Sequence, residues 1–530
     1  MKRSLLFALM LCFAAVVSAS DFYGDPVRAE SMGGHKIALI DASTISDLYS
    51  MGYSSAVFAR PKKSFVQLLP GIGFNTFKSV EDDIQETTRA NDLFGISNGD
   101  FISGNEGAQI WLSDDTVVAV KPYLSGFFGQ YKRSYPGTPL TPDAIDDETY
   151  YLLGGIFEFS QKIAGNIAVA GSAGYVRKGV SETDREDGDK SNNFNDKIEL
   201  ALSAAMLPDS AEGLALAVNI GNKTATLPVL PSNVSLGIFS ELDYVGAIFN
   251  YLYGAGYYSE YESPAGTLNK NTSGMITSGI TADLGASMSA KDGSVISGKA
   301  GITAGYKITE KFKYIDENIS TGEETVTSEG EEVSVENGLG VFAEFNVRKN
   351  LGGITAGVRG SVNMLGYKRP GSDINYTSTV FNADAGICIG EKGGVQIPVE
   401  FFTAGLLMAE KDGDYYEEGI YYDFGVRAGV EIPLGKDFAV RLGADYGLFA
   451  DYWFEKTGNT ITDQSALSGS AANPYYAQLG INAGIGLKIE GMEINLGAKI
   501  EPFWRSPKSD GYTQWSDMRI SGKAGVRIPL

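Results

Sequence analysis

The stretch from Phe438 to Phe454 reads FAVRLGADYGLFADYWF and decides the fold class. Every second residue from Phe438 onward is apolar, while the residues between include Arg441 and Asp445. Successive side chains of a β-strand point to opposite faces, so this alternation gives one wholly apolar face. The stretch therefore predicts a long strand that separates an apolar surface from a polar one.

The same alternation recurs along most of the chain after Ser64. It predicts strands near 63–77, 105–113, 116–131, 149–162, 165–178, 194–207, 212–222, 233–241, 243–260, 273–290, 294–313, 333–348, 352–368, 375–390, 394–409, 416–433, 437–455, 474–490, 491–505 and 517–530. The best count is therefore 20 strands in an all-β fold.

The connections between these strands alternate between tight turns and long polar loops. The tight turns are Lys291–Gly293, Lys349–Leu351, Glu391–Gly393, Gly435–Lys436 and Glu490–Gly491. The long loops are 179–193, 261–272, 314–332, 369–374, 410–415, 456–473 and 506–516. Outer-membrane barrels have short periplasmic turns, longer external loops and an even strand number. We therefore expect a large antiparallel transmembrane β-barrel with Leu530 on the periplasmic side.

A soluble β-sandwich also alternates, but it turns its apolar face inward. Predicted strands such as 437–455 are longer than the roughly 5 to 6 residues of ordinary strands. They also exceed the about 9 to 11 residues that cross a bilayer. Glycine is common on the polar face, and aromatic residues such as Tyr452 and Trp453 gather at outer strand ends, as in the interfacial girdles of membrane barrels. These features favour the membrane barrel.

The N-terminus has the form of a secretory signal peptide. Met1-Lys2-Arg3 precedes an apolar run from Leu5 to Val17, and small residues follow up to Ala19. The apolar run is too short to cross a bilayer as an anchor. We expect residues 1–19 to be cleaved, and residues 61–530 to form a barrel in the outer membrane.

Residues 20–60, here called the plug segment, lack the strand alternation. A short helix is predicted from Ser43 to Met51, with Ser43 or Thr44 as N-cap and Gly52 just past its end. We expect this segment to act as a plug or hatch. The residues that we assign to the gate are Met32, Gly33, Gly34, His35, Asp41 and Tyr49.

Composition limits the class of protein further. The formal net charge is -22, which argues against nucleic-acid binding and suits acidic external loops. After the signal peptide no stretch reaches 18 consecutive apolar residues, so no transmembrane helix is predicted. Cys388 is the one cysteine of the mature chain, so no internal disulfide is expected.

The chain offers little for catalysis or metal binding. His35 is the single histidine and lies in the plug segment, so a Ser-His-Asp or Cys-His arrangement is not expected. No cysteine and histidine cluster is suited to zinc. The acidic stretches 184–189 and 317–332 offer oxygen ligands for calcium, but they lack the EF-hand spacing, and we favour solvated charge. We therefore expect no enzyme activity, metal or cofactor.

The polar face of the strands would line the lumen. Its charged residues are Arg359, Asp423, Arg427, Arg441, Asp445, Glu493, Lys499, Arg519, Lys523 and Arg527. Burying such charges without partners or water is costly, so we expect a lumen that is wet, cross-linked by ion pairs, or both. These charged residues either cross-link the barrel strands by ion pairs or line a solute path.

The last strand carries a signal of its own. Its outward residues are Met518, Ile520, Ala524, Val526, Ile528 and Leu530, and the chain ends there. A terminal amphipathic strand resembles the outer-membrane insertion signal, although Leu530 stands where phenylalanine is more usual. We expect outer-membrane lipid and the outer-membrane assembly machinery as partners.

The segment from Arg28 to Ala56 resembles the start of FadL-like outer-membrane proteins, which include long-chain fatty-acid transporters. Arg28-Ala29, Met32-Gly33-Gly34, Ala38-Leu39 and Asp41 match the pattern of that family. The Asn-Pro-Ala-Gly motif that follows in the family corresponds to Gly52–Ala56, where Asn and Pro are missing. The resemblance implies a barrel of 14 strands with an N-terminal hatch, so the expected strand number ranges from 14 to 20.

Two functions follow as hypotheses. The first is passive uptake of small hydrophobic or amphiphilic solutes through the barrel, with the plug segment as gate. The second is a non-transporting surface barrel that serves as a structural, adhesion or secretion partner through its acidic loops. A fatty-acid substrate does not follow from the resemblance, because FadL-like proteins differ in cargo.

Overall fold

The computed structural model describes residues 28, 31–32, 48–49, 51–60, 62–68, 71–81, 84–96, 107–134, 144–184, 190–208, 213–221, 252–263, 267–368, 370–371, 374–391, 393–458, 460–465, 476–505 and 512–530. The predicted signal peptide lies outside these residues, as do Gly33, Gly34, His35 and Asp41 of the plug segment.

The described chain consists of one short 3₁₀ helix followed by strands. The elements are η1 (Ser54–Ala59), β1 (Phe65–Leu68), β2 (Gly71–Glu81), β3 (Ile84–Ile96), β4 (Gly107–Ser113), β5 (Thr116–Ser134), β6 (Ala144–Ala164), β7 (Ile167–Asp184), β8 (Lys190–Met206), β9 (Gly213–Gly221), β10 (Leu252–Ser263), β11 (Thr267–Ser289), β12 (Val295–Asn318), β13 (Glu323–Asn350), β14 (Ile354–Lys368), β15 (Asn375–Ile389), β16 (Ile397–Asp412), β17 (Tyr415–Pro433), β18 (Phe438–Thr457), β19 (Thr460–Ser465), β20 (Tyr476–Ile489), β21 (Met492–Arg505) and β22 (Tyr512–Pro529).

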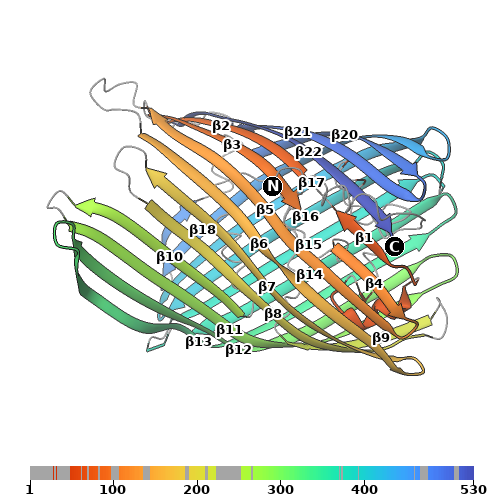
Figure 1. Ribbon diagram of the computed structural model, residues 1–530, viewed down its shortest axis with the longest axis horizontal. Helices are drawn as coiled ribbons and strands as arrows, with labels where there is room; N and C mark the ends of the chain where they lie inside the picture. The colour runs from red at the N-terminus through yellow and green to blue at the C-terminus, as the bar shows by residue number, and fades with distance from the viewer. Residues whose placement is uncertain are drawn as a thin grey trace.

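Antiparallel pairing closes these strands into a barrel of 18 strand positions (Figure 1). β1 and β2 share one position and both pair with β22, which closes the ring. β3 and β4 share the next position beside β5, and β9 and β10 share the position between β8 and β11. β19 pairs with the outer end of β18 and is not a member of the ring.

The prediction of an all-β antiparallel barrel with an even strand number is confirmed, and 18 lies within the expected range. The best count of 20 is too high because the alternation divides 212–260 into three strands, whereas β9 and β10 fill one position. The strand predicted at 233–241 lies outside the described residues. The alternation also misses β3, which continues the position of β4.

The predicted long loops are corrected by the structure, because much of their length is paired strand. β12 and β13 remain paired from the barrel wall out to Asn318 and Glu323, within the loop predicted at 314–332. Thr325, Val326 and Thr327 favour extended backbone, and ladder hydrogen bonds need no apolar face outside a membrane. The tight turns stand as predicted, for example between Ser289 and Val295.

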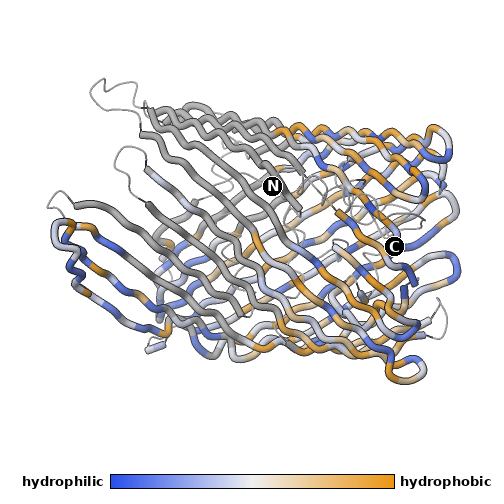
Figure 2. Tube along the Cα trace, in the orientation of Figure 1, coloured by the Kyte–Doolittle hydropathy of each residue, from blue (hydrophilic) through white to orange (hydrophobic). Residues whose placement is uncertain are grey.

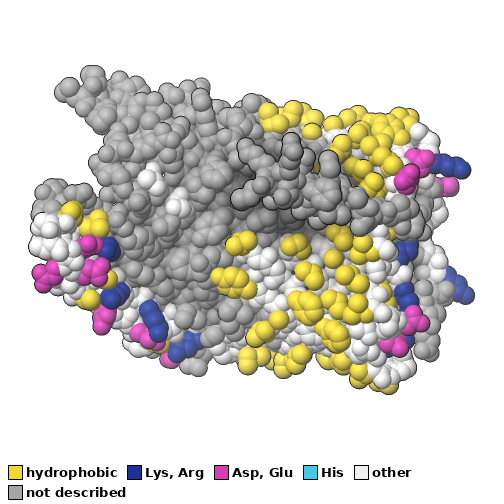
Figure 3. All heavy atoms as spheres, in the orientation of Figure 1, with side chains coloured by type: hydrophobic (Ala, Val, Ile, Leu, Met, Phe, Trp, Pro, Cys, Tyr) yellow, Lys and Arg dark blue, Asp and Glu magenta, His cyan; other side chains and the backbone are white. Residues whose placement is uncertain are grey.

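Large apolar side chains cover the outside of the barrel wall. Leu202 and Phe401 are 66% and 65% exposed, while the next residues, Ser203 and Phe402, are buried on the inner face. Figure 2 shows apolar and polar residues alternating along the strands, and in Figure 3 the apolar side chains gather toward the end that holds the C-terminus. A closed barrel with an apolar outer belt leaves no strand edge facing lipid. The chain is an outer-membrane β-barrel, as predicted.

No helix in the described residues is long and apolar enough to cross a membrane.

The helix predicted from Ser43 to Met51 is largely outside the described residues. Leu48, Tyr49 and Met51, which are described, lie in turns, and the short helix η1 comes after them. Gly52 donates a backbone hydrogen bond to Tyr49, and Tyr53 donates one to Leu48. The positive φ of Gly52, 102°, suits this reversal of the chain.

Candidate functional site

The described residues of the plug segment lie inside the ring and contact opposite sides of its wall. Arg28, Ser31 and Met32 lie against β17 and β20. Residues 48–49 and 51–57 pack with inward residues of β5, β7, β8 and β9, which include Ala168 and Ala217. The plug segment is therefore attached to the wall at two distant places.

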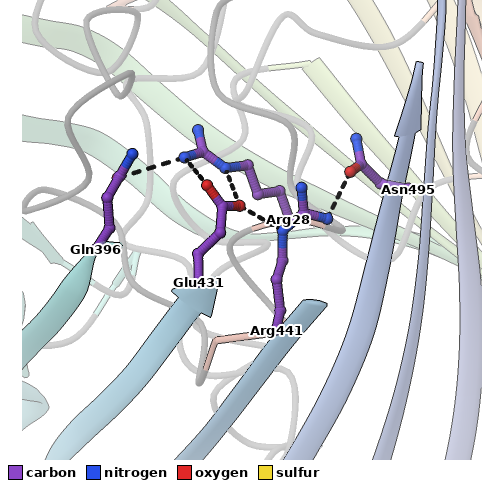
Figure 4. Close-up of polar contacts among 5 residues, drawn as sticks. All are labelled: Arg28, Gln396, Glu431, Arg441 and Asn495. Atoms are coloured by element: carbon purple, nitrogen blue, oxygen red, sulfur yellow. Dashed lines mark hydrogen bonds and ion pairs between the residues drawn. The ribbon is translucent and has the colours of Figure 1, made fainter. Parts of the chain in front are cut away.

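The first attachment is ionic and centres on Glu431 of β17 (Figure 4). Arg28 donates from Nε and Nη2 to the two carboxylate oxygens of Glu431, at 2.9 and 2.8 Å, and from Nη2 to Gln396 Oε1 at 3.4 Å. Arg441 of β18 donates to Glu431 Oε2 and to Asn495 Oδ1, each at 2.5 Å. The carboxylate of Glu431 is thus shared by one guanidinium of the plug segment and one of the wall.

Glycines in the wall make room for the same part of the plug segment. A β-carbon built on Gly429 would lie 2.7 Å from Met32 Cβ, and one built on Gly484 would lie 2.6 Å from Ser31 Cβ. Carbon atoms in contact need about 3.5 to 4.0 Å. Larger residues at these two positions would therefore displace Ser31 and Met32.

The second attachment centres on Glu158 of β6, which is almost fully buried. The hydroxyl of Ser54 donates to Glu158 Oε1 at 2.9 Å, and that of Tyr49 donates to Oε2 at 3.3 Å. Lys121 of β5 forms an ion pair with Glu158 at 3.0 Å. Arg60 lies 4.2 Å from the Tyr49 ring centroid, which adds a cation–π contact.

Backbone contacts extend this attachment to the neighbouring strands. The Ser55 amide donates to Ser203 Oγ of β8 at 3.1 Å, and Ser160 Oγ of β6 donates to the Ser54 carbonyl at 3.0 Å. On the other flank, Lys299 of β12 donates to the Met51 carbonyl at 2.8 Å. The backbone carbonyls of Met51 and Ser54 and the Ser55 amide are therefore matched by polar groups of the wall.

Tyr53 lies between these contacts and is 1% exposed. A β-carbon built on Gly285 of β11 would lie 2.6 Å from Tyr53 Cζ. The Tyr53 ring therefore packs directly against the backbone of this glycine. Burial, together with the carboxylates of Asp283 and Glu344, raises the pKa of the Tyr53 hydroxyl. The hydroxyl therefore stays neutral, which suits its buried position.

The wall itself is cross-linked by ion pairs beyond the plug contacts. Arg427 pairs with Glu400 at 2.8 Å and with Asp384 at 3.6 Å, and its guanidinium lies 4.1 Å from the ring centroid of Phe402. These residues come from the adjacent strands β15, β16 and β17. Arg427 therefore links the three strands on their inner face.

A second cross-link joins β18 to its neighbours. Asp445 pairs with Lys499 of β21 at 3.3 Å and accepts from Asn482 Nδ2 of β20 at 3.0 Å. A third joins β13 to the strands beside it, where Glu344 pairs with Lys299 at 3.3 Å and with Arg359 at 3.5 Å. Charges of both signs on neighbouring strands thus meet across the inner wall.

The residues assigned from the sequence take different positions. Met32 and Tyr49 of the gate set are buried, and the other four gate residues lie outside the described residues. On the inner face, those that are buried are Arg359, Arg427, Arg441, Asp445 and Arg527, and those that are half-buried are Glu493, Lys499 and Lys523. Asp423 and Arg519 belong to β17 and β22, and their side chains lie outside the description.

The sequence-based assignment misses the residues that hold the plug segment, above all Arg28, Glu158 and Gln396. Glu158 leaves a usable signal, because it stands between the apolar residues Phe157 and Phe159 in a predicted strand. That position is inward by the period of two. Arg28 leaves no such signal, because the plug segment has no periodic pattern.

No group of three or more His, Cys, Asp or Glu side chains suited to a metal ion occurs among the described residues.

Comparison with known proteins gives distant similarities only. No protein-family model matches the chain, and no curated protein matches it. Among solved structures, the toluene transporter TodX of Pseudomonas putida is 12% identical, with 96% of this chain and 99% of that chain covered and a TM-score of 0.31. The toluene transporter TbuX of Ralstonia pickettii is 8% identical, with 96% and 99% covered and a TM-score of 0.30.

The ferric yersiniabactin uptake receptor FyuA from Yersinia pestis is also similar, at 8% identity, with 89% of this chain and 81% of that chain covered and a TM-score of 0.37. TodX and TbuX are themselves FadL-family channels. Similarities this low carry no argument about cargo or mechanism, which have to come from the contacts between the plug segment and the wall.

Proposed function

We propose that the barrel takes up small hydrophobic or amphiphilic solutes passively across the outer membrane, with the plug segment as its gate. The observation that carries this proposal is that, at the contacts among the described residues, the wall needs no charge from the plug segment. At these contacts, each charged wall residue that holds the plug segment also has an opposite charge on the wall. A plug attached in this way can leave these contacts without leaving a buried charge of the wall unpaired.

The three charged contacts follow the same arrangement. Glu431 keeps Arg441 when Arg28 leaves, and Glu158 keeps Lys121 when Tyr49 and Ser54 leave. Lys299 keeps Glu344 after losing the Met51 carbonyl. Leaving one member of a buried ion pair alone costs about 3–5 kcal/mol. Displacing the plug segment avoids that cost at all three contacts, which supports a movable gate rather than a permanent core.

Swelling of proteoliposomes tests this function without any energy source. The solute is a short-chain alkyl glucoside, which is amphiphilic but too polar to cross lipid quickly. The full-length protein is compared with the double variant R28A/Y53A, which weakens both attachments. We expect slow swelling with the unaltered chain and several-fold faster swelling with the variant.

The control is Lys349→Ala, which removes an exposed ion pair with Asp292 at a short turn, away from the described contacts of the plug segment. It should swell at the unaltered rate. An absence of swelling with both the full-length protein and R28A/Y53A would contradict uptake. That result would favour the second function, a non-transporting surface barrel, which the extended pairing of β12 and β13 also suits.

A further inference from the structure

One transverse row of the inner wall differs from the charged rows nearer the short turns. Phe342, Asn363, Val380 and Leu406 stand directly opposite one another on β13, β14, β15 and β16. All four side chains point inward and are buried. Three are apolar, so this row, here called the Asn363 row, places a single amide in an apolar surface.

The next row toward the long hairpins repeats the arrangement. Leu365 stands opposite Ser378, and both are buried on the inner face. Ser378 in turn stands opposite Met408 of β16. The two rows together form an apolar surface that contains one amide and one hydroxyl.

These two polar side chains have no hydrogen bonds. Within the described part of the chain, neither Oδ1 nor Nδ2 of Asn363 has a partner, and Ser378 Oγ has none. The neighbours of Asn363 along the strand, Val362 and Met364, are exposed on the outer apolar belt, so the row lies at the depth of the lipid. Buried polar groups are nearly always paired, so an unpaired amide and an unpaired hydroxyl in adjacent rows call for a partner that is not part of the wall.

The charges next to these rows are already paired. Toward the short turns, the adjoining row contains Glu344, Ser361 and Asn382. Glu344 engages both nearby cations, Lys299 at 3.3 Å and Arg359 at 3.5 Å. An incoming carboxylate would therefore approach the anion Glu344, which is ion-paired with Lys299 and Arg359, whereas a neutral hydrogen-bonding group meets no such repulsion.

We infer that the Asn363 row and the row beside it form a subsite for an uncharged amphiphile. The apolar body of the solute lies on Phe342, Leu365, Val380 and Leu406. Its head, an amide, carbonyl or hydroxyl group, pairs with Asn363 and Ser378. This inference rests on the proposed function, because the rows are buried in this structure and a solute reaches them only when the lumen opens.

Ligand binding to the full-length protein in lipid nanodiscs tests the subsite. Saturation-transfer NMR compares hexanamide with hexanoate at neutral pH, two probes with the same chain and different head charge, with empty nanodiscs as background. We expect hexanamide to bind at least about tenfold more tightly than hexanoate. Asn363→Leu should remove most of that preference, and Ser378→Ala part of it.

Met364→Leu is the matched control, because Met364 is the next residue and faces lipid. It should keep the preference. If Asn363→Leu does not fold, Asn363→Asp preserves the shape while replacing the neutral amide with an anion, and it should also lose hexanamide binding. Equal binding of the two probes, no binding of either, or an unchanged preference in the Asn363 variants would overturn the inference.

The failure of this inference is distinguishable from failure of the proposed function. Swelling of proteoliposomes together with equal binding of both probes would leave uptake standing and remove the subsite. A clear preference for hexanamide without any swelling would leave the subsite and remove uptake.

Discussion

Glu431 accepts hydrogen bonds from two guanidinium groups, one in the plug segment and one in the wall. Substitutions of single residues can therefore test whether the two share this carboxylate. Glu431→Gln leaves Arg28 and Arg441 close together without an anion, which should cost about 3–5 kcal/mol of unfolding free energy. Arg28→Ala leaves Glu431 paired with Arg441 and should cost roughly 1.5–3 kcal/mol, the worth of charged hydrogen bonds. Urea unfolding in micelles measures both, and a larger cost for Arg28→Ala would contradict the shared carboxylate.

Gly285 gives a second test, because the Tyr53 ring lies on its bare backbone. Gly285→Ala inserts a methyl group where there is no room, and overpacking of this kind costs about 1–3 kcal/mol. We expect the plug segment to be cleaved faster by protease in this variant. Gly366→Ala is the control, since its β-carbon would have no atom nearer than 3.9 Å. Equal cleavage of the two variants would argue against seating of the plug segment at Gly285.

Local periodicity accounts for some of these residues and not for others. The period of two places Arg441 and Glu431 on the inward face, and the turn at Gly435–Lys436 sets the register in which they stand opposite each other. That pair was within reach of the sequence. The pair of Arg28 with Glu431 was not, because it joins positions 403 residues apart and one partner has no periodic neighbours.

Among the elements, the turn between β11 and β12 is held by Asp292. The Ser294 amide donates to Asp292 Oδ1 at 2.9 Å, and Lys349 from the next turn donates to Oδ2 at 3.2 Å. The hydrogen bond from Ser294, and then Lys349, lower the pKa of Asp292 from 3.8 to about 2. Because the folded pKa is the lower one, the stabilisation is present above the unfolded pKa and is lost as the pH falls through the folded pKa.

We therefore expect Asp292→Asn to destabilise the barrel at neutral pH and to have little effect below about pH 2, where both forms are neutral. The measurement is the difference in urea midpoint between the two proteins from pH 5 downward. A difference that persists unchanged at the lowest pH would show that the carboxylate charge is not what holds this turn.

Element ends were the least predictable part of the wall. The alternation finds the membrane-spanning half of β12 and β13 but stops where apolar residues stop, although the two strands pair as far as Asn318 and Glu323. Pairing beyond the lipid depends on backbone hydrogen bonds between two distant stretches. A pattern based on side-chain polarity does not report them.

For the whole molecule, closure of the ring depends on the last strand. β22 pairs with β1 from Val526 to Pro529 and with β2 along most of its remaining length. Deleting residues 526–530 removes the β22 partner of β1 and leaves only the β2–β22 ladder across the seam, so we expect a smaller fraction of the barrel to close. The loss of the heat-modifiable form on gels measures this, and normal closure would contradict it.

Leu530→Ala is the control for that deletion, because the Leu530 side chain is exposed while its backbone amide still donates to Ser64. It should close normally. We also propose that the assembly machinery recognises β22, in which case the deletion should reduce insertion in cells more than refolding in micelles.

The strand number shows what limits prediction for a molecule of this size. Fold class and the direction of each strand follow from alternation and turn length, because both are local. The number 18 depends on whether β9 and β10 occupy one position or two, and that is settled only by their shared neighbours β8 and β11. When two separate segments fill one strand position, the order of strands along the sequence does not show that they share it.

The glycines that receive the plug segment have a practical consequence for the barrel as a pore. Gly285, Gly429 and Gly484 lie at points around the inner circumference, none facing lipid. In a chain without residues 20–60, Gly285 and Gly429 lose their contacts with Tyr53 and Met32, whereas a β-carbon at Gly484 would still lie 2.7 Å from the Leu496 carbonyl oxygen. Conductance of such a pore could then be tuned by substituting Gly285 and Gly429 in turn, narrowing the aperture or changing its charge while the membrane-facing surface stays as it is.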